Sequence, residues 1–179
     1  LRPYQLDAIK SIQQSASEGN NRFLFEMATG TGKTMISAAV IKLFLRTGNA
    51  KRVLFLVDRL ELEDQAYKAF KEYLKNDYQC VIFKENRDDW MKAEIVVTTI
   101  QSLMVNDKYK QMFSPTDFDL VISDESHRSI SGNSRAVFEY FLGYKLGLTA
   151  TPKRTTNTDT YKYFGDPVFI YSLKEGIKD

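Results

Sequence analysis

Apolar residues recur at helical spacing in some segments of this chain and in short unbroken runs in others. Behind Pro3, the residues Leu6, Ile9 and Ile12 follow helical spacing, which predicts a first helix that ends at the polar stretch 18–21. The unbroken runs have the length of strands that are buried on both faces. Helices that alternate with such strands predict an α/β fold, with a mostly parallel sheet and helices on both of its faces.

The expected elements follow one another from the first helix to the end of the pattern. Strands are expected at Phe23–Phe25, Val53–Val57, Val81–Phe83, Ile95–Val97, Leu120–Ile122 and Lys145–Leu148. Further helices are expected at Met35–Leu45, Leu60–Leu74 and Arg135–Phe141. No internal repeat, low-complexity tract or proline-rich linker interrupts the pattern, so residues 1–179 are expected to form a single domain.

The composition fits one globular domain. The chain has 179 residues, 43% of them hydrophobic and 27% charged, which is enough to bury a full core. No apolar run approaches the roughly 20 residues that span a bilayer, so we expect a cytoplasmic protein without membrane contact. Cys80 is the single cysteine and lies in an apolar stretch, so we expect a buried thiol and no intrachain disulfide.

The charge balance and the chain ends add two expectations. Lys and Arg number 25 against 23 Asp and Glu, and the resulting net charge of +2 gives no electrostatic reason to expect nucleic acid as a partner. The chain starts at Leu1 rather than at a methionine and stops at Asp179 in a charged segment. We therefore expect a fragment of a longer protein.

A glycine-containing loop between the first strand and the second helix has the composition of a phosphate cradle. Its small residues allow backbone N–H groups to close around phosphates at a helix N-terminus. Lys33 is expected to reach the β- and γ-phosphates, and the Thr34 hydroxyl is expected to hold Mg²⁺. Met27 stands where the general pattern has its first glycine, so a plain glycine turn is an alternative. The candidate nucleotide-binding residues are Thr29, Gly30, Thr31, Gly32, Lys33 and Thr34.

Two adjacent carboxylates follow the apolar run Leu120–Ile122. Asp124 and Glu125 lie at the carboxyl end of this expected strand, where side chains of a parallel sheet face a cleft. In a nucleotide triphosphatase, Asp124 would hold Mg²⁺ and Glu125 would activate the attacking water as a general base. The alternative is a capped helix start. His127 is the one histidine, which excludes a multi-histidine metal site, and its place beside the carboxylates favours a functional role.

The loop 28–34 and the segment Asp-Glu-Ser-His at 124–127 resemble motifs I and II of superfamily 2 helicases, which commonly lack the first glycine. Residues 1–5 resemble the adenine-reading motif of that superfamily, and residues 148–152 resemble its motif III. The resemblance implies a RecA-like P-loop NTPase fold, the first of two ATPase lobes, with ATP and Mg²⁺ as cofactors.

The resemblance also assigns roles to residues outside the phosphate cradle. It implies that Gln5 binds the adenine edge and that His127 contacts the nucleotide. It further implies that Thr149 and Thr151 couple the ATP site to lobe movement and to the grip on nucleic acid. The alternatives are a polar surface role for Gln5 and turn hydroxyls for the two threonines.

Two further stretches, 57–62 and 98–103, resemble motifs Ia and Ib, which contact the nucleic-acid backbone in this superfamily. By this resemblance Arg59, Thr99 and Gln101 are the expected nucleic-acid-binding residues. Arginines, hydroxyls and helix N-termini hold phosphates without reading sequence, as a motor on arbitrary sequence requires. Ordinary loop polarity is the alternative at each position.

Longer phrases at 55–59, 123–130 and 163–167 look like the motor subunit of type I restriction enzymes, within a similarity that runs from Leu1 to Asp179. That family implies duplex DNA as the track, a second lobe and a nuclease domain in the same chain, and modification and specificity subunits as partners. Since the transition-state arginines of this superfamily come from the second lobe, we expect ATP binding but weak turnover by this chain alone. The alternatives are a superfamily 2 motor of DNA repair or RNA remodelling, a nucleotide-gated scaffold that binds nucleic acid, and a P-loop kinase.

Overall fold

The protein is built on one central sheet whose recorded strand pairings are all parallel. A computed structural model describes residues 2–27, 32–75, 77–83, 87–130, 132–150 and 160–171. The sheet has seven strands in the order β3-β4-β2-β5-β6-β1-β7. Their bounds are β1 Arg22–Met27, β2 Val53–Val57, β3 Cys80–Ile82, β4 Ile95–Thr99, β5 Leu120–Asp124, β6 Tyr144–Thr149 and β7 Phe169–Tyr171.

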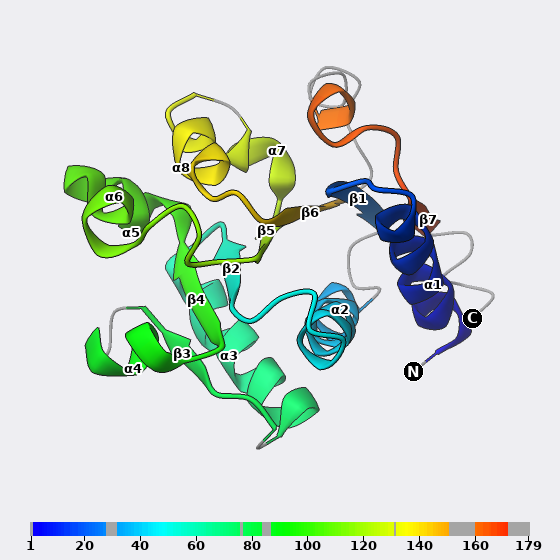
Figure 1. Cartoon of the computed structure of the whole chain (residues 1–179), viewed down its shortest axis with the longest axis horizontal. Coiled ribbons are helices and arrows are strands. Elements are labelled where there is room, and N and C mark those ends of the chain that lie inside the picture. Colours follow the sequence, from blue (N-terminus) through cyan, green and yellow to red (C-terminus); the bar gives the residue numbers. More distant parts are fainter. Residues whose placement is uncertain are drawn as a thin grey trace.

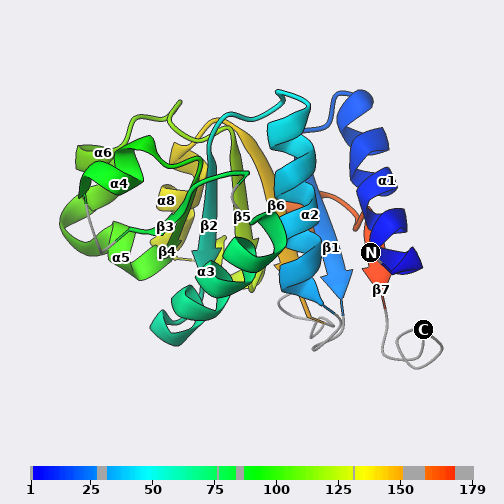
Figure 2. The same ribbon diagram turned by 90° about the horizontal axis from the view of Figure 1, so that it is seen from below.

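Helices cover both faces of the sheet, as the alternating pattern predicted (Figure 1). One face carries α1 Pro3–Ser17, α2 Lys33–Arg46 and α3 Leu60–Leu74, which Figure 2 shows in front of the strands. The other face carries α4 Arg87–Lys92, α5 Ile100–Met104, α6 Lys108–Met112, α8 Ser134–Tyr140 and a helical turn at 160–164. The short η1 Val105–Asp107 joins α5 to α6, and α7 Ser126–Ser129 follows β5.

The alternation of side chains along the strands divides the core into two layers. Phe23 and Phe25 of β1 point toward α1 and α2, whereas Leu24 between them packs in the layer on the opposite face. All three side chains are fully buried, and each such burial contributes about 1.5–3 kcal/mol. Every residue of β2 is buried as well, which explains its unbroken apolar run.

The elements expected from the sequence are present, with ends that differ by at most two residues. The expected strand at 81–83 is Cys80–Ile82, because Phe83 lies in the turn that follows. The helical spacing of Leu6, Ile9 and Ile12 correctly predicted α1. Within this helix Leu6 is 46% exposed, whereas Tyr4, Ala8 and Ile12 are buried.

Two features expected from the composition, the state of Cys80 and the membrane-spanning potential of the helices, can be compared with the structure. Cys80 is buried as predicted, and desolvation by burial raises the pKa of its thiol to about 12, so the group is an unreactive thiol at neutral pH. In the described part of the chain, no helix combines the length and the apolar character that crossing a bilayer requires.

Candidate functional site

The candidate chemistry gathers at the carboxyl ends of the central strands. Because the sheet is parallel, the ends of β1, β5 and β6 lie on the same edge, in the strand order β5-β6-β1. Figure 2 shows the first residues of α2 beside the arrowhead of β1 at this edge. The segments predicted to hold nucleotide, the first turn of α2 and the end of β5, are therefore brought together by the topology.

Lys33 is the centre of this arrangement. Its Nζ lies 3.4 Å from Asp124 Oδ1 and 3.6 Å from Glu125 Oε1, so one ammonium group faces both carboxylates. The side chains of Lys33, Asp124 and Glu125 are 15%, 23% and 31% exposed, so solvent can reach them. The structure thus confirms that the residues predicted from separate motifs are neighbours, although their sequence positions are 91 residues apart.

Glu125 has a backbone conformation that few side chains adopt. Its φ is 55° and its ψ is 56°, in the left-handed region, directly after the last residue of β5. The Asp124 Oδ1 accepts the Glu125 backbone N–H at 3.1 Å and supports this sharp turn. No side-chain cap bond starts α7 at Glu125, so the capped-helix alternative does not describe its side chain. Such strain is typical of functional positions.

The residues present fit a divalent cation. Lys33 offers one positive charge against two carboxylates, so the cluster keeps a negative excess that a cation would neutralise. A carboxylate oxygen from Asp124 and a hydroxyl from Thr34, the second residue of α2, are hard oxygen donors of the kind that Mg²⁺ prefers. The role of both residues toward Mg²⁺ remains a prediction.

Gly32 is the last residue before α2, and two side chains of α1 lie close to it. Its φ is 81°, and a Cβ there would lie 3.1 Å from the Tyr4 hydroxyl and 3.2 Å from Gln5 Nε2. The Tyr4 ring stacks on Tyr171 of β7, with ring centroids 4.0 Å apart. Gly32 therefore lies against α1, and α1 in turn packs against β7 at one end of the sheet (Figure 1).

Gln5 has a structural partner as well as a place near the loop. Its Oε1 accepts the Arg2 backbone N–H at 2.9 Å, a bond that satisfies a free N–H at the start of α1. The residue is 1% exposed, so it is not the polar surface residue of the alternative reading. Its adenine contact remains a prediction.

Gly32→Ala is expected to weaken ATP binding by about tenfold, or about 1.4 kcal/mol. The new methyl group strains the left-handed backbone and presses on Tyr4 and Gln5, which displaces the N–H groups that would face the phosphates. Gly48→Ala is the control, because Gly48 has a φ of 75° and open space around it at the far end of α2. Calorimetric titration with ATP should show a loss of affinity in the first variant alone; equal affinities would contradict the assigned role.

Several predicted residues are only partly described. Thr29, Gly30, Thr31 and Thr151 lie outside the described residues, and so does the side chain of His127, whose backbone belongs to α7. Thr149 is 6% exposed and donates its hydroxyl to the Ala150 carbonyl at 3.1 Å. This bond matches the turn-hydroxyl alternative, and the coupling role of Thr149 remains a prediction.

The three predicted nucleic-acid-binding residues line one groove of about 410 Å³ at the same edge of the sheet. Arg59 precedes α3, while Thr99 and Gln101 lie at the start of α5. Arg59 and Gln101 are exposed, but Thr99 is 3% exposed and its hydroxyl accepts the Ser102 backbone N–H at 3.1 Å. Thr99 therefore caps α5, and Ser102, which the motif reading missed, is the hydroxyl that remains more accessible.

The charged side chains that line this groove are one arginine and two carboxylates. Among the lining residues Arg59 is the one cation, and Asp58 and Glu61 are carboxylates beside it. Leu60 and Val105 are 56% and 53% exposed there and offer apolar surface. If the groove binds phosphate, as the prediction for Arg59 requires, this one guanidinium group supplies the positive charge among its lining residues.

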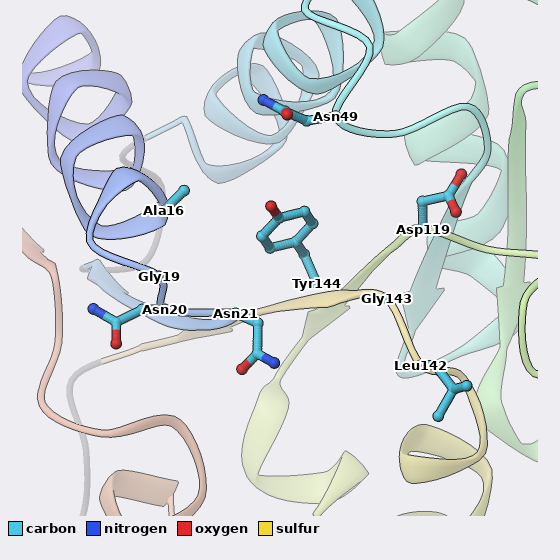
Figure 3. A pocket seen from close by; sticks show the side chains of 9 residues that line it. All are labelled: Ala16, Gly19, Asn20, Asn21, Asn49, Asp119, Leu142, Gly143 and Tyr144. Carbon is cyan, nitrogen blue, oxygen red and sulfur yellow. The ribbon is translucent and has the colours of Figure 1, made fainter.

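A second cavity, of about 290 Å³, lies near the amino ends of β1 and β6 and contains none of the predicted residues (Figure 3). The Tyr144 ring occupies its centre, between Ala16 and Asn49. Its polar side chains are engaged in loop closure: Asn20 donates to Ser15 Oγ, and Asp119 accepts two backbone N–H groups. This cavity therefore belongs to the loops that join the elements.

The fold agrees with that of a solved ATPase core. The Sulfolobus solfataricus SWI2/SNF2 ATPase core in complex with double-stranded DNA matches with a TM-score of 0.77, over 98% of this chain and 37% of that one. The sequences are 18% identical, so this likeness shows the fold alone. It confirms the predicted α/β, RecA-like class.

Closer relatives are restriction enzyme subunits. The type I restriction enzyme EcoAI endonuclease subunit of Escherichia coli is 40% identical over 189 residues, which cover 99% of this chain and 22% of the relative. A fragment described as an HsdR subunit of a type I restriction enzyme from Vibrio vulnificus YJ016 is 34% identical, with a TM-score of 0.74 over 99% of this chain and 31% of that one. The chain thus spans about a fifth of the length of the curated relative. The family model described as type III restriction enzyme, res subunit, matches residues 1–154, and the chain belongs to this family.

Proposed function

We propose that this chain is the ATP-binding lobe of an ATP-driven DNA translocase, the R subunit of a type I restriction-modification enzyme. The observation that carries the proposal is Lys33 at the first turn of α2, held between Asp124 and Glu125 at the carboxyl edge of the sheet. A phosphate-binding lysine that faces a metal-binding carboxylate and a general base is the arrangement that NTP hydrolysis needs. The names of the relatives support the restriction assignment.

The residues suggest how hydrolysis proceeds. Lys33 exchanges its carboxylate contacts for the β- and γ-phosphates when ATP binds. Glu125 accepts a proton from the water whose oxygen attacks the γ-phosphorus, while the bond to the β,γ-bridging oxygen breaks and ADP leaves. Asp124 and Thr34 would hold Mg²⁺, which supplies positive charge to the phosphate oxygens.

The other domains and the partner subunits of the enzyme are also proposals. The fraction of the relatives that this chain covers leaves room for a second lobe and a nuclease domain in the parent chain. Modification and specificity subunits would complete the enzyme on duplex DNA. Since transition-state arginines of a second lobe are worth about 10³–10⁵ in rate, the chain alone should bind ATP and turn it over weakly.

The test of this function is the ATPase rate of the full-length subunit, assembled with its partner subunits, on different nucleic acids. Duplex DNA should raise the rate, while single-stranded DNA and RNA should not. Stimulation by RNA or single strands alone would remove the restriction assignment and leave a helicase of another branch. An absence of ATP binding by this chain would remove the motor assignment altogether.

Arg59→Ala is expected to lower duplex DNA affinity by about threefold to tenfold and to reduce the salt slope of binding by about one. The reason is the loss of the one guanidinium group of the groove, which would contact a phosphate whatever the base sequence. Fluorescence anisotropy across a salt series in the assembled enzyme measures both quantities. Arg46→Ala, which removes an exposed arginine at the end of α2, is the control and should change neither.

A further inference from the structure

Glu26, the residue before the last one of β1, forms a hydrogen bond outside the cluster of Lys33, Asp124 and Glu125. Its Oε1 accepts the hydroxyl of Tyr161 at 2.5 Å, and the two residues are 135 positions apart. The hydrogen bond to Glu26, together with burial and the nearby carboxylates of Glu26 and Asp166, raises the pKa of Tyr161 to about 12. Tyr161 therefore remains a protonated donor at neutral pH.

The position of Glu26 in the sheet places it beside motif III. In register, Glu26 pairs with Thr149 of β6 on one side and with Ile170 of β7 on the other. Paired residues of adjacent parallel strands point to the same face, so the Glu26 and Thr149 side chains share a face at the end of the sheet. Met27, the next residue, ends the strand that leads into the phosphate loop.

The turn that carries Tyr161 packs on the same part of the molecule. A Cβ on Gly147 would lie 2.8 Å from the Phe164 ring and 2.9 Å from Ser126 Cβ, so both residues pack close to Gly147 of β6, where the glycine leaves room. Tyr163 lies under the Arg22 guanidinium, 4.2 Å from its ring centroid. The turn thus contacts β1 and β6, and Ser126 at the start of α7 approaches the same glycine.

We propose that Glu26 and Tyr161 form a positioning pair that fixes the helical turn 160–164 to β1, the strand that ends at Met27. Its hydrogen bond joins Tyr161, which lies between β6 and β7 in the chain, to β1. Glu26 is the residue before Met27, which ends that strand. The function of the pair is to hold this turn against Gly147 of β6 and near Ser126, the residue that follows Glu125. The inference rests on the proposed motor function.

Tyr161→Phe tests the pair, with Tyr163→Phe as a matched control. Both variants remove one hydroxyl from the same helical turn, but within the described residues the buried Tyr163 hydroxyl has no hydrogen-bond partner. In the full-length subunit with its partner subunits, Tyr161→Phe should lower the DNA-stimulated kcat about tenfold. It should leave the ATP Kd within twofold of wild type and the melting temperature within about 4 °C. Tyr163→Phe should leave all three quantities near wild type.

Substitutions at Glu26 give the reciprocal test. Glu26→Gln keeps an oxygen that accepts the Tyr161 hydroxyl and should retain most of the stimulated kcat, whereas Glu26→Ala should match Tyr161→Phe. Equal kcat values for Tyr161→Phe and Tyr163→Phe, with a stimulated wild type, would overturn the pair alone. A parallel loss of ATP affinity and melting temperature in Tyr161→Phe would assign it a general structural role and also overturn it. A wild type that shows neither ATP binding nor stimulation would overturn the motor function itself.

Discussion

Lys33→Ala is expected to weaken ATP binding by about 100-fold, or about 3 kcal/mol. Among the described side chains, its ammonium group is the cation that faces Asp124 and Glu125, at 3.4 Å and 3.6 Å. Without it, two carboxylates face the site where the triphosphate binds, and repulsion adds to the loss of the charge-assisted contacts. Calorimetric titration of the chain with ATP and Mg²⁺ measures the affinity directly.

Lys42→Ala is the matched control for Lys33→Ala. Lys42 lies on the same helix, α2, but lines a surface hollow against α3 far from the carboxylates. Its removal should leave ATP affinity unchanged. Because Asp124 and Glu125 stay partly exposed to water, the fold of Lys33→Ala should survive with little loss of melting temperature. Retention of wild-type affinity by Lys33→Ala would contradict the phosphate-binding role.

Much of this site was predictable because its parts obey local rules. The apolar run before Asp124 predicted a buried strand, and a parallel sheet then puts the carboxylates on the edge that carries the first turn of α2. Arg59 and Gln101 follow the carboxyl ends of β2 and β4, and they line one groove because these two strands pair in register. Position along a strand was thus sufficient to predict the edge of the sheet, while the order of the strands came from the structure.

The remainder depends on tertiary contacts that no local pattern contains. The hydrogen bond between Tyr161 and Glu26 joins residues 135 positions apart. The position of β7 beside β1 was equally hidden, since β7 has three residues, too few for a reliable period. The exposure of Leu6 depends on which face of α1 meets β7, and the buried position of Thr99 depends on the cap of α5. Thr99 and Ser102 have a spacing typical of an N-cap, and this was the available signal.

Glu125→Gln is expected to lower the DNA-stimulated kcat of the assembled enzyme by about 1000-fold, within the range for loss of a general base. The amide keeps the shape of the side chain and its oxygen can still lie beside the Lys33 ammonium group, but it cannot take a proton from the attacking water. The loss of one negative charge beside the phosphates should leave ATP affinity equal to wild type or slightly tighter. The expected signature is therefore a loss of kcat with KM unchanged or lower.

The conformation of Glu125 makes this test specific. Glutamine has the same backbone preferences as glutamate, so Glu125→Gln retains the left-handed turn with φ of 55° and the bond from its N–H to Asp124. Glu72→Gln, an exposed residue on α3, makes the same chemical change away from the site and should leave kcat unaltered. If Glu125→Gln kept kcat within threefold of wild type while still binding ATP, another group would have to accept the proton. The strained turn that brings Glu125 to Lys33 would then serve nucleotide binding rather than the chemical step.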